Sequence, residues 1–321
     1  MANIAIIGAT GLVGQTMLEA LETSDIYVDD LTLYASKKSA GTSILFKGSP
    51  YYVQTLSKDS IDPSIDYALF SAGSDISKAY APYFKEKKIT IIDNSSAFRS
   101  DAAIPLIVPE VNPTKCRGAS LIANPNCSTI QAVLPLHIIH KLYGIKRINY
   151  VTLQAVSGAG YKGLEILNND ETLTDAHAIN DNVIPKIDVF EADHYTFEET
   201  KMIQETKKIF NDASLNITAT CIRVPVTHAH GVNITVETHN TPDLTVLETA
   251  FNKAQGIQYY QHPTYPTPQD ARGQNDVLVG RLRLDKSAQN SIHLWTVADN
   301  IRKGAAYNAV QILKQHMEDK T

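Results

Sequence analysis

An apolar segment that runs directly into regularly spaced glycines constrains the fold of this chain more than any other stretch. Residues 4–7 are apolar and strand-like, residues 8–14 read Gly-Ala-Thr-Gly-Leu-Val-Gly, and residues 15–21 show a helical pattern. This order is typical of a dinucleotide-binding fold, because glycines let main-chain N–H groups approach a pyrophosphate at the helix N-terminus. A tight turn without a ligand is the alternative, since the spacing is G-x-x-G-x-x-G rather than the commoner G-x-G-x-x-G. We expect cofactor contacts from Gly8, Thr10, Gly11, Leu12, Val13 and Gly14.

The residues after the next apolar segment, residues 31–34, favour NADP over NAD. That segment continues into a turn that contains Ser36, Lys37, Lys38 and Ser39. An NAD site usually has Asp or Glu here to hold the ribose 2′-OH, whereas lysines and serines offer cations and hydroxyl donors to a 2′-phosphate. A solvated basic turn is the alternative. We therefore predict NADP as the cofactor, held in part by Ser36, Lys38 and Ser39.

Strands and helices alternate through the first third of the chain. Residues 67–71 and 89–92 read as strands, with a helix over residues 77–88 between them. This alternation predicts an α/β fold with a Rossmann-type, doubly wound parallel sheet. Ligands bind at the carboxyl ends of such strands, so the polar loop of residues 93–99 is a candidate site. Arg99 in this loop can reach an anionic substrate, although a plain surface charge is the alternative.

Cys127 falls at a predicted helix N-terminus. The apolar residues 120–123 end at Pro125, and a helical pattern covers residues 129–142. Free N–H groups and the helix dipole favour an anion there, so a thiol ionises more readily and becomes a nucleophile. A buried, inert thiol is the usual fate of a lone cysteine. The polar flanks of Cys127, Pro-Asn before and Ser-Thr after, favour the reactive interpretation.

The rest of the sequence indicates a second, α+β domain. A chain of 321 residues has room for two domains. We place them at residues 1–125 with 304–321, for the nucleotide, and at residues 126–303, for catalysis. Pro135 is expected to kink the helix after Cys127 or to reset its start. The other expected elements are helices over 197–210 and 305–316, strands over 148–156, 219–226 and 233–238, and a hairpin of strands 277–284 and 291–297. Residues 161–196 show no clear period, and we expect only one helix there, near residues 161–167.

Several polar residues of this second domain are candidates for substrate binding or catalysis. Gln154 lies near the end of a strand, before the flexible loop of residues 157–160, although a half-buried structural Gln is equally consistent. Glu198 and Lys201 are three residues apart and share a helix face, which by default is a solvated face. Arg223 lies in an apolar strand and needs an anionic partner, which a bound carboxylate would supply.

His228 and His230 follow Arg223 and lie two residues apart. No Cys, His or carboxylate set completes a metal site with them, so we expect no metal. One of the two histidines is a candidate general base or acid, and spacing alone does not choose between them. The two strands that flank them, residues 219–226 and 233–238, are expected to belong to an antiparallel sheet.

Composition excludes several classes of function. The chain is 43% hydrophobic and 20% charged with a net charge of −5, so it has no basic footprint for nucleic acid. No apolar run is long enough to span a bilayer, and no basic region precedes the first apolar residues as in a signal peptide. Three cysteines, an odd number, argue against a disulfide framework and for a reducing compartment. We expect a cytoplasmic protein that acts on a small molecule.

A nucleotide cradle, an activated Cys127 and a histidine together indicate aldehyde oxidation through a thioester, or its reverse. Thiolate attack on an aldehyde creates an oxyanion that needs hydrogen-bond donors. The N–H of Cys127 and the side chain of Asn126 are candidates for these donors. Water, phosphate or coenzyme A would then release the thioester.

These motifs resemble the aspartate-β-semialdehyde dehydrogenase family. The resemblance covers nearly the whole chain, and its motifs occur in the same order as in the family. They are residues 8–14, 93–99, 124–129, 154–160, 198–202, 223–226 with His230, and 299–306.

The resemblance implies a role for each matching residue. Cys127 would form the thioester, and His230 would be the catalytic histidine, since the family's histidine lies seven residues after the arginine. The other implied roles are substrate orientation by Gln154, carboxylate binding by Arg223, ammonium binding by Glu198, phosphate binding by Arg99 and Lys201, and cofactor contacts by Ser157, Gly158, Asn300, Lys38 and Ser39. Related enzymes often carry Arg in place of Lys38, so selectivity for NADP is expected to be weaker here.

The implied reaction is the reduction of L-aspartyl 4-phosphate by NADPH to L-aspartate 4-semialdehyde and phosphate, on the pathway to lysine, threonine and methionine. The family usually forms homodimers or homotetramers. N-acetyl-glutamyl-phosphate reductase is the nearest alternative, but its cysteine motif reads Pro-Gly-Cys followed by an aromatic residue. A non-catalytic NADP-binding protein is a further alternative, against which the intact Cys127, His230 and Arg223 argue.

Overall fold

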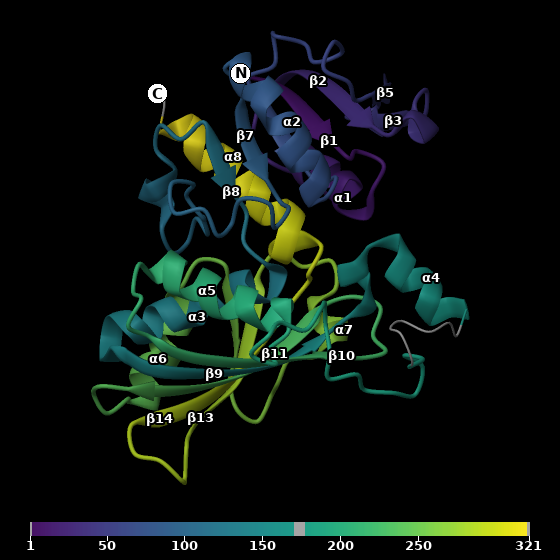
Figure 1. The fold of residues 1–321 in the computed structure, drawn as a ribbon. Coiled ribbons are helices and arrows are strands. Elements are labelled where there is room, and N and C mark those ends of the chain that lie inside the picture. Colours follow the sequence, from purple (N-terminus) through teal and green to yellow (C-terminus); the bar gives the residue numbers. More distant parts are fainter. Residues whose placement is uncertain (1, 170–176, 320–321) are drawn as a thin grey trace. The chain divides into compact units, whose positions relative to one another are not determined.

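The computed structural model describes residues 2–169 and 177–319 (Figure 1). The chain divides into two compact units. The first comprises Met1–Pro125 with Ala305–Thr321, and the second comprises Asn126–Gly304. None of the described helices is both long and apolar enough to cross a membrane.

A parallel sheet forms the centre of the first unit. In the part of the chain that the structure describes, this sheet has six strands in the order β5-β2-β1-β6-β7-β8, and each neighbouring pair is parallel. The strands are β1 (Ala2–Ile7), β2 (Val28–Ala35), β5 (Gln54–Thr55), β6 (Tyr67–Phe70), β7 (Thr90–Asp93) and β8 (Leu121–Ala123), and β3 (Ser43–Phe46) with β4 (Ser49–Tyr52) makes a separate hairpin. The predicted Rossmann-type fold of this part is thus confirmed.

Helices cover both faces of this sheet. They are α1 (Leu12–Glu22), α2 (Ser74–Glu86) and α8 (Tyr307–Glu318), with short turns at η1 (Lys37–Ser39) and η2 (Pro113–Cys116). In β1, Ile4 and Ile6 pack with residues of α1 and α8, whereas Ala5 and Ile7 pack with residues of α2. A strand buried on both faces reads as a continuous apolar run, which is why β1 was recognisable in the sequence.

The glycine turn after β1 depends on close main-chain contacts. Gly8 has φ +90, and a Cβ there would lie 2.9 Å from the main chain of Ser71. Gly11 is the N-cap of α1. A Cβ at Gly14 would lie 2.2 Å from the carbonyl oxygen of Gly8, so only glycine fits where α1 passes the turn. The turn therefore holds α1 against the end of β1.

A mixed sheet forms the centre of the second unit. Within the described residues its order is β10-β9-β11-β14-β13-β12, with strands β9 (Ile145–Gln154), β10 (Asn216–Arg223), β11 (His230–Thr238), β12 (Ile257–Tyr260), β13 (Val277–Leu284) and β14 (Ser291–Ala298). Strands β13 and β14 form the predicted antiparallel neighbours. The prediction that residues 219–226 form an antiparallel strand is wrong, because β10 pairs in parallel with β9 and does not pair with β11. A parallel pair needs a crossover connection, and helix α5 (Phe197–Phe210), which packs on β10, supplies it.

Helices α3 (Cys127–Tyr143), α5 and α6 (Leu244–Lys253) pack beside one another on this sheet (Figure 1). Pro135 lies inside α3 and does not reset its start, which is at Cys127. The predicted helix over 161–167 is α4 (Tyr161–Asn169). The unassigned stretch after it includes residues 170–176, which lie outside the described residues. The remaining elements are α7 (Pro268–Ala271), η3 (Val156–Ala159) and η4 (Arg302–Ala306), a π-helical turn before α8.

The contact between Gly14 and Gly8 gives a stability prediction. A Gly→Ala change at an ordinary helix position stabilises by about 0.5–1 kcal/mol. We expect Gly14→Ala instead to lower the free energy of unfolding by about 3 kcal/mol or more, because the new methyl group clashes with main chain. Gly11→Ala, at φ −77 and with a 3.3 Å contact, is the matched control and should cost about 1 kcal/mol or less. Urea unfolding measures both, and equal stabilities would contradict the prediction.

Candidate active site

Cys127 is the first residue of helix α3, as the sequence predicted. Asn126 is the N-cap, and its Oδ1 accepts hydrogen bonds from the N–H groups of Ser128 at 2.9 Å and Thr129 at 3.2 Å. Cys127 is half-buried, whereas Cys116 and Cys221 are fully buried. Burial raises the pKa of Cys116 to about 11 and also raises that of Cys221. Cys127 is therefore the cysteine whose position suits nucleophilic chemistry.

Two carboxylates of helix α5 hold the residue before this cysteine. Glu205 Oε2 accepts a hydrogen bond from the main-chain N–H of Asn126 at 2.6 Å. Glu198 Oε1 accepts one from Asn126 Nδ2 at 2.8 Å. Both polar atoms of the Asn126 side chain are thus engaged by the protein itself. An oxyanion contact from Asn126 would have to use the second hydrogen of Nδ2.

Glu198 is the centre of a buried polar network. Besides Asn126, its Oε1 accepts from Gln154 Nε2 at 3.1 Å, and its Oε2 lies 2.6 Å from Lys201 Nζ. Burial alone would raise the pKa of Glu198. The charge of Lys201 and the hydrogen bonds from Lys201, Asn126 and Gln154 outweigh burial and lower the pKa to about 2. The helix face that would by default be solvated therefore carries a buried, ionised carboxylate.

Gln154 and Arg223 end neighbouring strands and are register partners in β9 and β10. Gln154 is buried, and its Nε2 also donates to Thr152 Oγ1 at 3.2 Å. Arg223 is 8% exposed, and its Nη1 donates to the carbonyl oxygen of Ala155 at 2.7 Å. Burial lowers the pKa of Arg223, while the charges of Glu198 and Cys127 act against that shift. The structure thus brings Cys127, Glu198 and Arg223 within electrostatic reach of one another.

His230 begins β11 with its side chain fully buried. Its Nδ1 accepts a hydrogen bond from the N–H of Ala155 at 2.9 Å. Burial and the charge of Arg223 lower its pKa to about 3. His228 is half-buried, and the charges that act on it are those of Arg272 and Asp299. Spacing alone did not choose between His228 and His230. His230 is the one that contacts Ala155 and lies within the electrostatic reach of Arg223 and Glu198.

Asn300 links the residue before β11 to the turn that follows β9. Its Oδ1 accepts from the N–H of Ala229 at 2.9 Å, and its Nδ2 lies 3.0 Å from Ser157 Oγ. Ala229 has φ +70, a conformation that L-residues rarely adopt. Gly158 lies next to Ser157, and a Cβ there would come 3.1 Å from Arg223 Nη1. The predicted cofactor residues Ser157, Gly158 and Asn300 therefore lie close together. Gly158 is also next to Arg223 and His230.

Sequence reasoning missed three supporting residues. Glu205 and Thr152 hold Asn126 and Gln154, as described above. Gly304 packs on Cys127, since a Cβ at Gly304 would lie 2.8 Å from Cys127 Cβ. Glu205 follows Glu198 by two helical turns and lies on the same face, but this spacing alone does not name Asn126 as its partner.

In the first unit, the glycine turn contacts the end of β2 and the turn that follows it. Gly8 N–H donates to Tyr34 O at 2.8 Å, and Thr10 Oγ1 donates to Ser39 Oγ at 3.3 Å. Ser36 caps the turn η1, which contains Lys37, Lys38 and Ser39. The predicted pyrophosphate and 2′-phosphate contacts of this unit are therefore neighbours.

Arg99 lies in the loop after β7, also in the first unit. It is half-buried, and its Nη2 donates to the carbonyl oxygen of Asn94 at 2.8 Å. The neighbouring Asp93 is buried and accepts hydrogen bonds from Ser77 at 2.6 Å and Ser95 at 2.7 Å. Hydrogen bonds to Asp93 and to the carbonyl oxygen of Asn94 thus hold the start of this loop.

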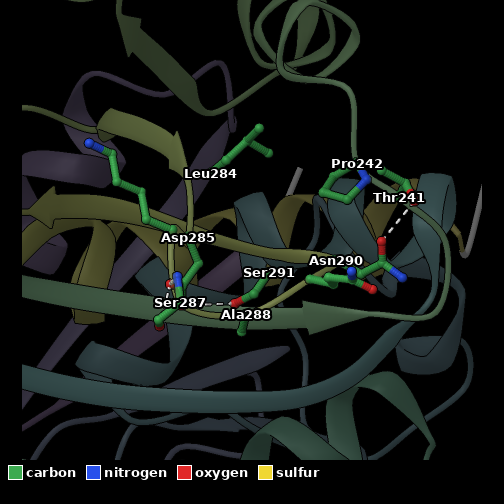
Figure 2. Close-up of a pocket in the computed structure, with 10 residues that line it drawn as sticks. Thr241, Pro242, Leu284, Asp285, Ser287, Ala288, Asn290 and Ser291 are labelled. Carbon is green, nitrogen blue, oxygen red and sulfur yellow. Dashed lines mark hydrogen bonds between the residues drawn. The ribbon is translucent and has the colours of Figure 1, made fainter.

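A pocket of about 570 Å³ at the turn between β13 and β14 lies outside this constellation. Figure 2 shows its lining, which contains Thr241, Pro242 and residues 284–291 but none of the predicted site residues. Two pairs of its polar side chains bond to each other: Ser287 donates to Asp285 at 2.7 Å, and Thr241 donates to Asn290 at 2.7 Å. Among the described residues no group of three or more His, Cys, Asp or Glu side chains could hold a metal ion.

The fold and the site together define a dehydrogenase with a nucleotide-binding domain and a second domain that carries a cysteine. Comparison with protein families agrees: residues 3–119 match the semialdehyde dehydrogenase NAD binding domain, and residues 135–303 match the semialdehyde dehydrogenase dimerisation domain. The chain belongs to the aspartate-semialdehyde dehydrogenase family, which confirms the resemblance found in the sequence motifs.

Relatives at full length support this membership. The aspartate-semialdehyde dehydrogenase of Aquifex aeolicus is 45% identical over 97% of this chain and 96% of its own length. That of Bacillus subtilis is 44% identical, with the same shares covered. A crystal structure of aspartate semialdehyde dehydrogenase II from Vibrio cholerae, complexed with ASA, superimposes with a TM-score of 0.97 at 44% identity and covers 100% of this chain and 99% of that one.

The pKa of Glu198 gives a prediction about stability and pH. Because the folded-state pKa of about 2 lies below the ordinary 4.5, the carboxylate stabilises the fold fully above that ordinary value, and this contribution is lost as the pH falls toward 2. Glu198→Gln should therefore lower the free energy of unfolding by roughly 3 kcal/mol near neutral pH and by much less near the folded-state pKa. Urea unfolding at several pH values measures this difference. Glu165→Gln, on the exposed face of α4, is the control and should change the free energy of unfolding by less than about 0.5 kcal/mol. A loss of stability in Glu198→Gln that does not depend on pH would contradict the prediction.

Proposed function

We propose that this protein catalyses the NADPH-dependent reductive dephosphorylation of L-aspartyl 4-phosphate to L-aspartate 4-semialdehyde, and the reverse phosphorylating oxidation. The observation that carries the proposal is the convergence of Cys127, Glu198 and Arg223 in the second unit. Membership of the aspartate-semialdehyde dehydrogenase family supports the same substrate. The pathway to lysine, threonine and methionine is the corresponding biosynthetic role.

The charges of the site complement an amino acid. The substrate carries an α-carboxylate and an α-ammonium group. Arg223 presents a guanidinium that can bind the carboxylate through paired hydrogen bonds. Glu198 remains ionised because its pKa is about 2, so it can attract the ammonium group. Gln154, held by Glu198 and Thr152, would orient the carbonyl that reacts.

Cys127 would form and release the covalent intermediate. Its thiolate, favoured by the N-terminus of α3, attacks the acyl carbon, and the bond to phosphate breaks to leave a thioester. The main-chain N–H of Cys127 and Asn126 Nδ2 are the proposed donors to the oxygen that becomes negative. Lys201 and, in the first unit, Arg99 are the proposed phosphate contacts. After reduction, the carbon–sulfur bond breaks, and Cys127 is restored as the aldehyde leaves.

The residues of the first unit fit a dinucleotide phosphate. Gly8 and Gly14 pack so closely on main chain that no side chain fits there. The N–H groups at the start of α1 suit a pyrophosphate, as at other helix N-termini. Lys38, Ser36 and Ser39 offer a cation and hydroxyl groups for a 2′-phosphate, with Thr10 beside Ser39. When bound, the nicotinamide cofactor supplies the hydride. The proposed contacts in this unit are Gly8, Thr10, Gly11, Leu12, Val13, Gly14, Ser36, Lys38 and Ser39, and those in the second unit are Ser157, Gly158 and Asn300.

The dimerisation domain that residues 135–303 match supports assembly with further copies of the chain. We propose a homodimer or homotetramer. We also propose a cytoplasmic location, because the described cysteines are in the thiol form rather than in disulfides, which suits a reducing compartment.

A direct assay tests the proposed reaction. Purified protein should form NADPH from L-aspartate semialdehyde and NADP only when phosphate is present. Cys127→Ala should lower the rate by about 10³-fold or more, since the nucleophile is lost. Cys116→Ala, which removes a buried thiol in the first unit, is the control and should keep the rate. No turnover by the wild type, or turnover unaffected by Cys127→Ala, would defeat the proposal, and faster turnover of N-acetylglutamate semialdehyde would favour the related reductase.

The proposed roles of Arg99 and Lys38 can be distinguished by their effects on the Michaelis constants for phosphate and for NADP. Arg99→Ala should raise the KM for phosphate by about tenfold or more and leave the KM for NADP nearly unchanged, because a charged hydrogen-bond donor to phosphate is lost. Lys38→Ala should show the opposite pattern and also reduce the preference for NADP over NAD. Each variant serves as the other's control. Equal effects on both constants would contradict the assigned roles.

A further inference from the structure

Two carboxylates from different segments of the second unit meet at the ammonium group of Lys201. Its Nζ lies 2.6 Å from Glu198 Oε2, on the same helix, and 3.1 Å from Asp188 Oδ2, in the loop that precedes α5. The centre of the Phe197 ring lies 4.9 Å from the same nitrogen, and the Lys201 side chain is only 15% exposed. The proposed phosphate contact of this unit is therefore occupied by groups of the protein itself.

The charges of this cluster do not suit a phosphate. Glu198 remains ionised because its pKa is about 2. Burial would lower the pKa of Lys201, but the charges and hydrogen bonds of Glu198 and Asp188 outweigh burial and raise it, so both carboxylates stabilise the ammonium. Two negative charges thus face one positive charge. While both carboxylates stay paired with Lys201, an incoming phosphate is repelled by two charges and attracted by one.

Asp188 is the carboxylate that can be displaced. The side chain of Glu198 is 6% exposed and is fixed by the hydrogen bonds described above, whereas that of Asp188 is 35% exposed. Besides its ion pair with Lys201, Asp188 accepts a hydrogen bond from the N–H of Val189, at 2.9 Å and within its own loop. Water can replace such contacts at an exposed carboxylate at little cost, but not at a buried one.

The loop around Asp188 is anchored by main-chain contacts. The carbonyl oxygen of Val189 accepts a hydrogen bond from the N–H of Phe197 at 2.8 Å, and the N–H of Glu191 donates to the carbonyl oxygen of Tyr195 at 2.8 Å. These bonds join the loop to the start of α5 without using the Asp188 side chain. The carboxylate can therefore leave the ammonium group by a change of rotamer alone, while the loop stays in place.

We propose that Asp188 competes with phosphate for Lys201: its carboxylate pairs with Lys201 when no phosphate is bound, and the phosphate group of the substrate displaces it. The inference rests on the proposed function, because it takes Lys201 as the phosphate contact of the second unit. A carboxylate oxygen then occupies the place that a phosphate oxygen takes in the complex. Asp188 thus weakens phosphate binding, and its return to Lys201 favours the release of phosphate in the reductive direction.

Two other roles for Asp188 make different predictions. If Asp188 held Lys201 in the orientation that binds phosphate, removal of its charge would weaken phosphate binding. If the ion pair were only a surface contact, its removal would change nothing, as for many exposed ion pairs. The sign of the change in phosphate affinity therefore separates competition from support.

Kinetics of the oxidative direction measure this sign. Asp188→Asn keeps the size of the side chain and suits the φ of +71 at this position, because Asn tolerates the left-handed region. It should lower the KM for phosphate by about three- to fivefold, in the range of a partly exposed ion pair, and leave the KM for NADP nearly unchanged. Asp181→Asn, at an exposed position with φ +52 in the same segment, is the matched control and should change the KM for phosphate by less than about 1.5-fold. An unchanged or higher KM for phosphate in Asp188→Asn would overturn the inference.

Calorimetry with inorganic phosphate tests the same point without turnover. Asp188→Asn should bind inorganic phosphate about three- to fivefold more tightly than the wild type. In a Lys201→Ala background the same change should lose most of this gain, because the group for which carboxylate and phosphate compete is absent. A gain that persists without Lys201, equal affinities of wild type and Asp188→Asn, or no detectable binding by either would overturn the inference. An inactive wild type would defeat the proposed function, whereas tighter phosphate binding by Asp188→Asn that depends on Lys201 would still support the competition.

Discussion

The buried carboxylate of Glu198 is the interaction on which the rest of the site depends. It receives hydrogen bonds from Asn126 and Gln154 and pairs with Lys201, so helix α5, the start of α3 and the end of β9 are joined at one group. A buried charge is costly unless donors surround it, and this requirement makes the positions of these elements interdependent. The nucleophile candidate Cys127 follows Asn126 directly, so the same requirement fixes where it stands. The arrangement of the candidate site in the second unit therefore rests on satisfying one carboxylate.

Local signals in the sequence predicted most of the elements, and the reason is physical. The turn of residues 8–14 needs glycine because main chain approaches main chain there, and that need is visible in the residues themselves. Helix α5 was predicted with the bounds that the structure has, since its periodicity and its capping box lie within one segment. The pairing of β10 was not predictable in the same way, because the direction of a strand depends on the connection that precedes it.

The sequence predicted which residues belong to the candidate site, but it predicted their geometry only in part. Cys127, Gln154 and Arg223 each stood out locally, by a helix start or by a polar residue in an apolar strand. Glu205 and Thr152 did not, because a glutamate on a helix and a threonine in a strand are ordinary until their partners are known. Asn126 shows the same limit: its residue type suits both a helix cap and an oxyanion donor, and its side chain is the cap of α3 and a donor to Glu198.

By itself the sequence determined the nucleotide fold of the first unit, the cysteine at a helix start and the family to which the chain belongs. These features depend on short segments whose conformations follow from their own residues. The tertiary structure alone decided that the carboxylate of Glu198 is buried among hydrogen bonds from Asn126 and Gln154, and that Nδ1 of His230 accepts a hydrogen bond from the main chain of Ala155. Each of these depends on burial and on hydrogen bonds between residues far apart in the chain, 72 residues for Asn126 with Glu198 and 75 for Ala155 with His230. Packing brings such atoms together, and no local pattern records their distance or their protonation.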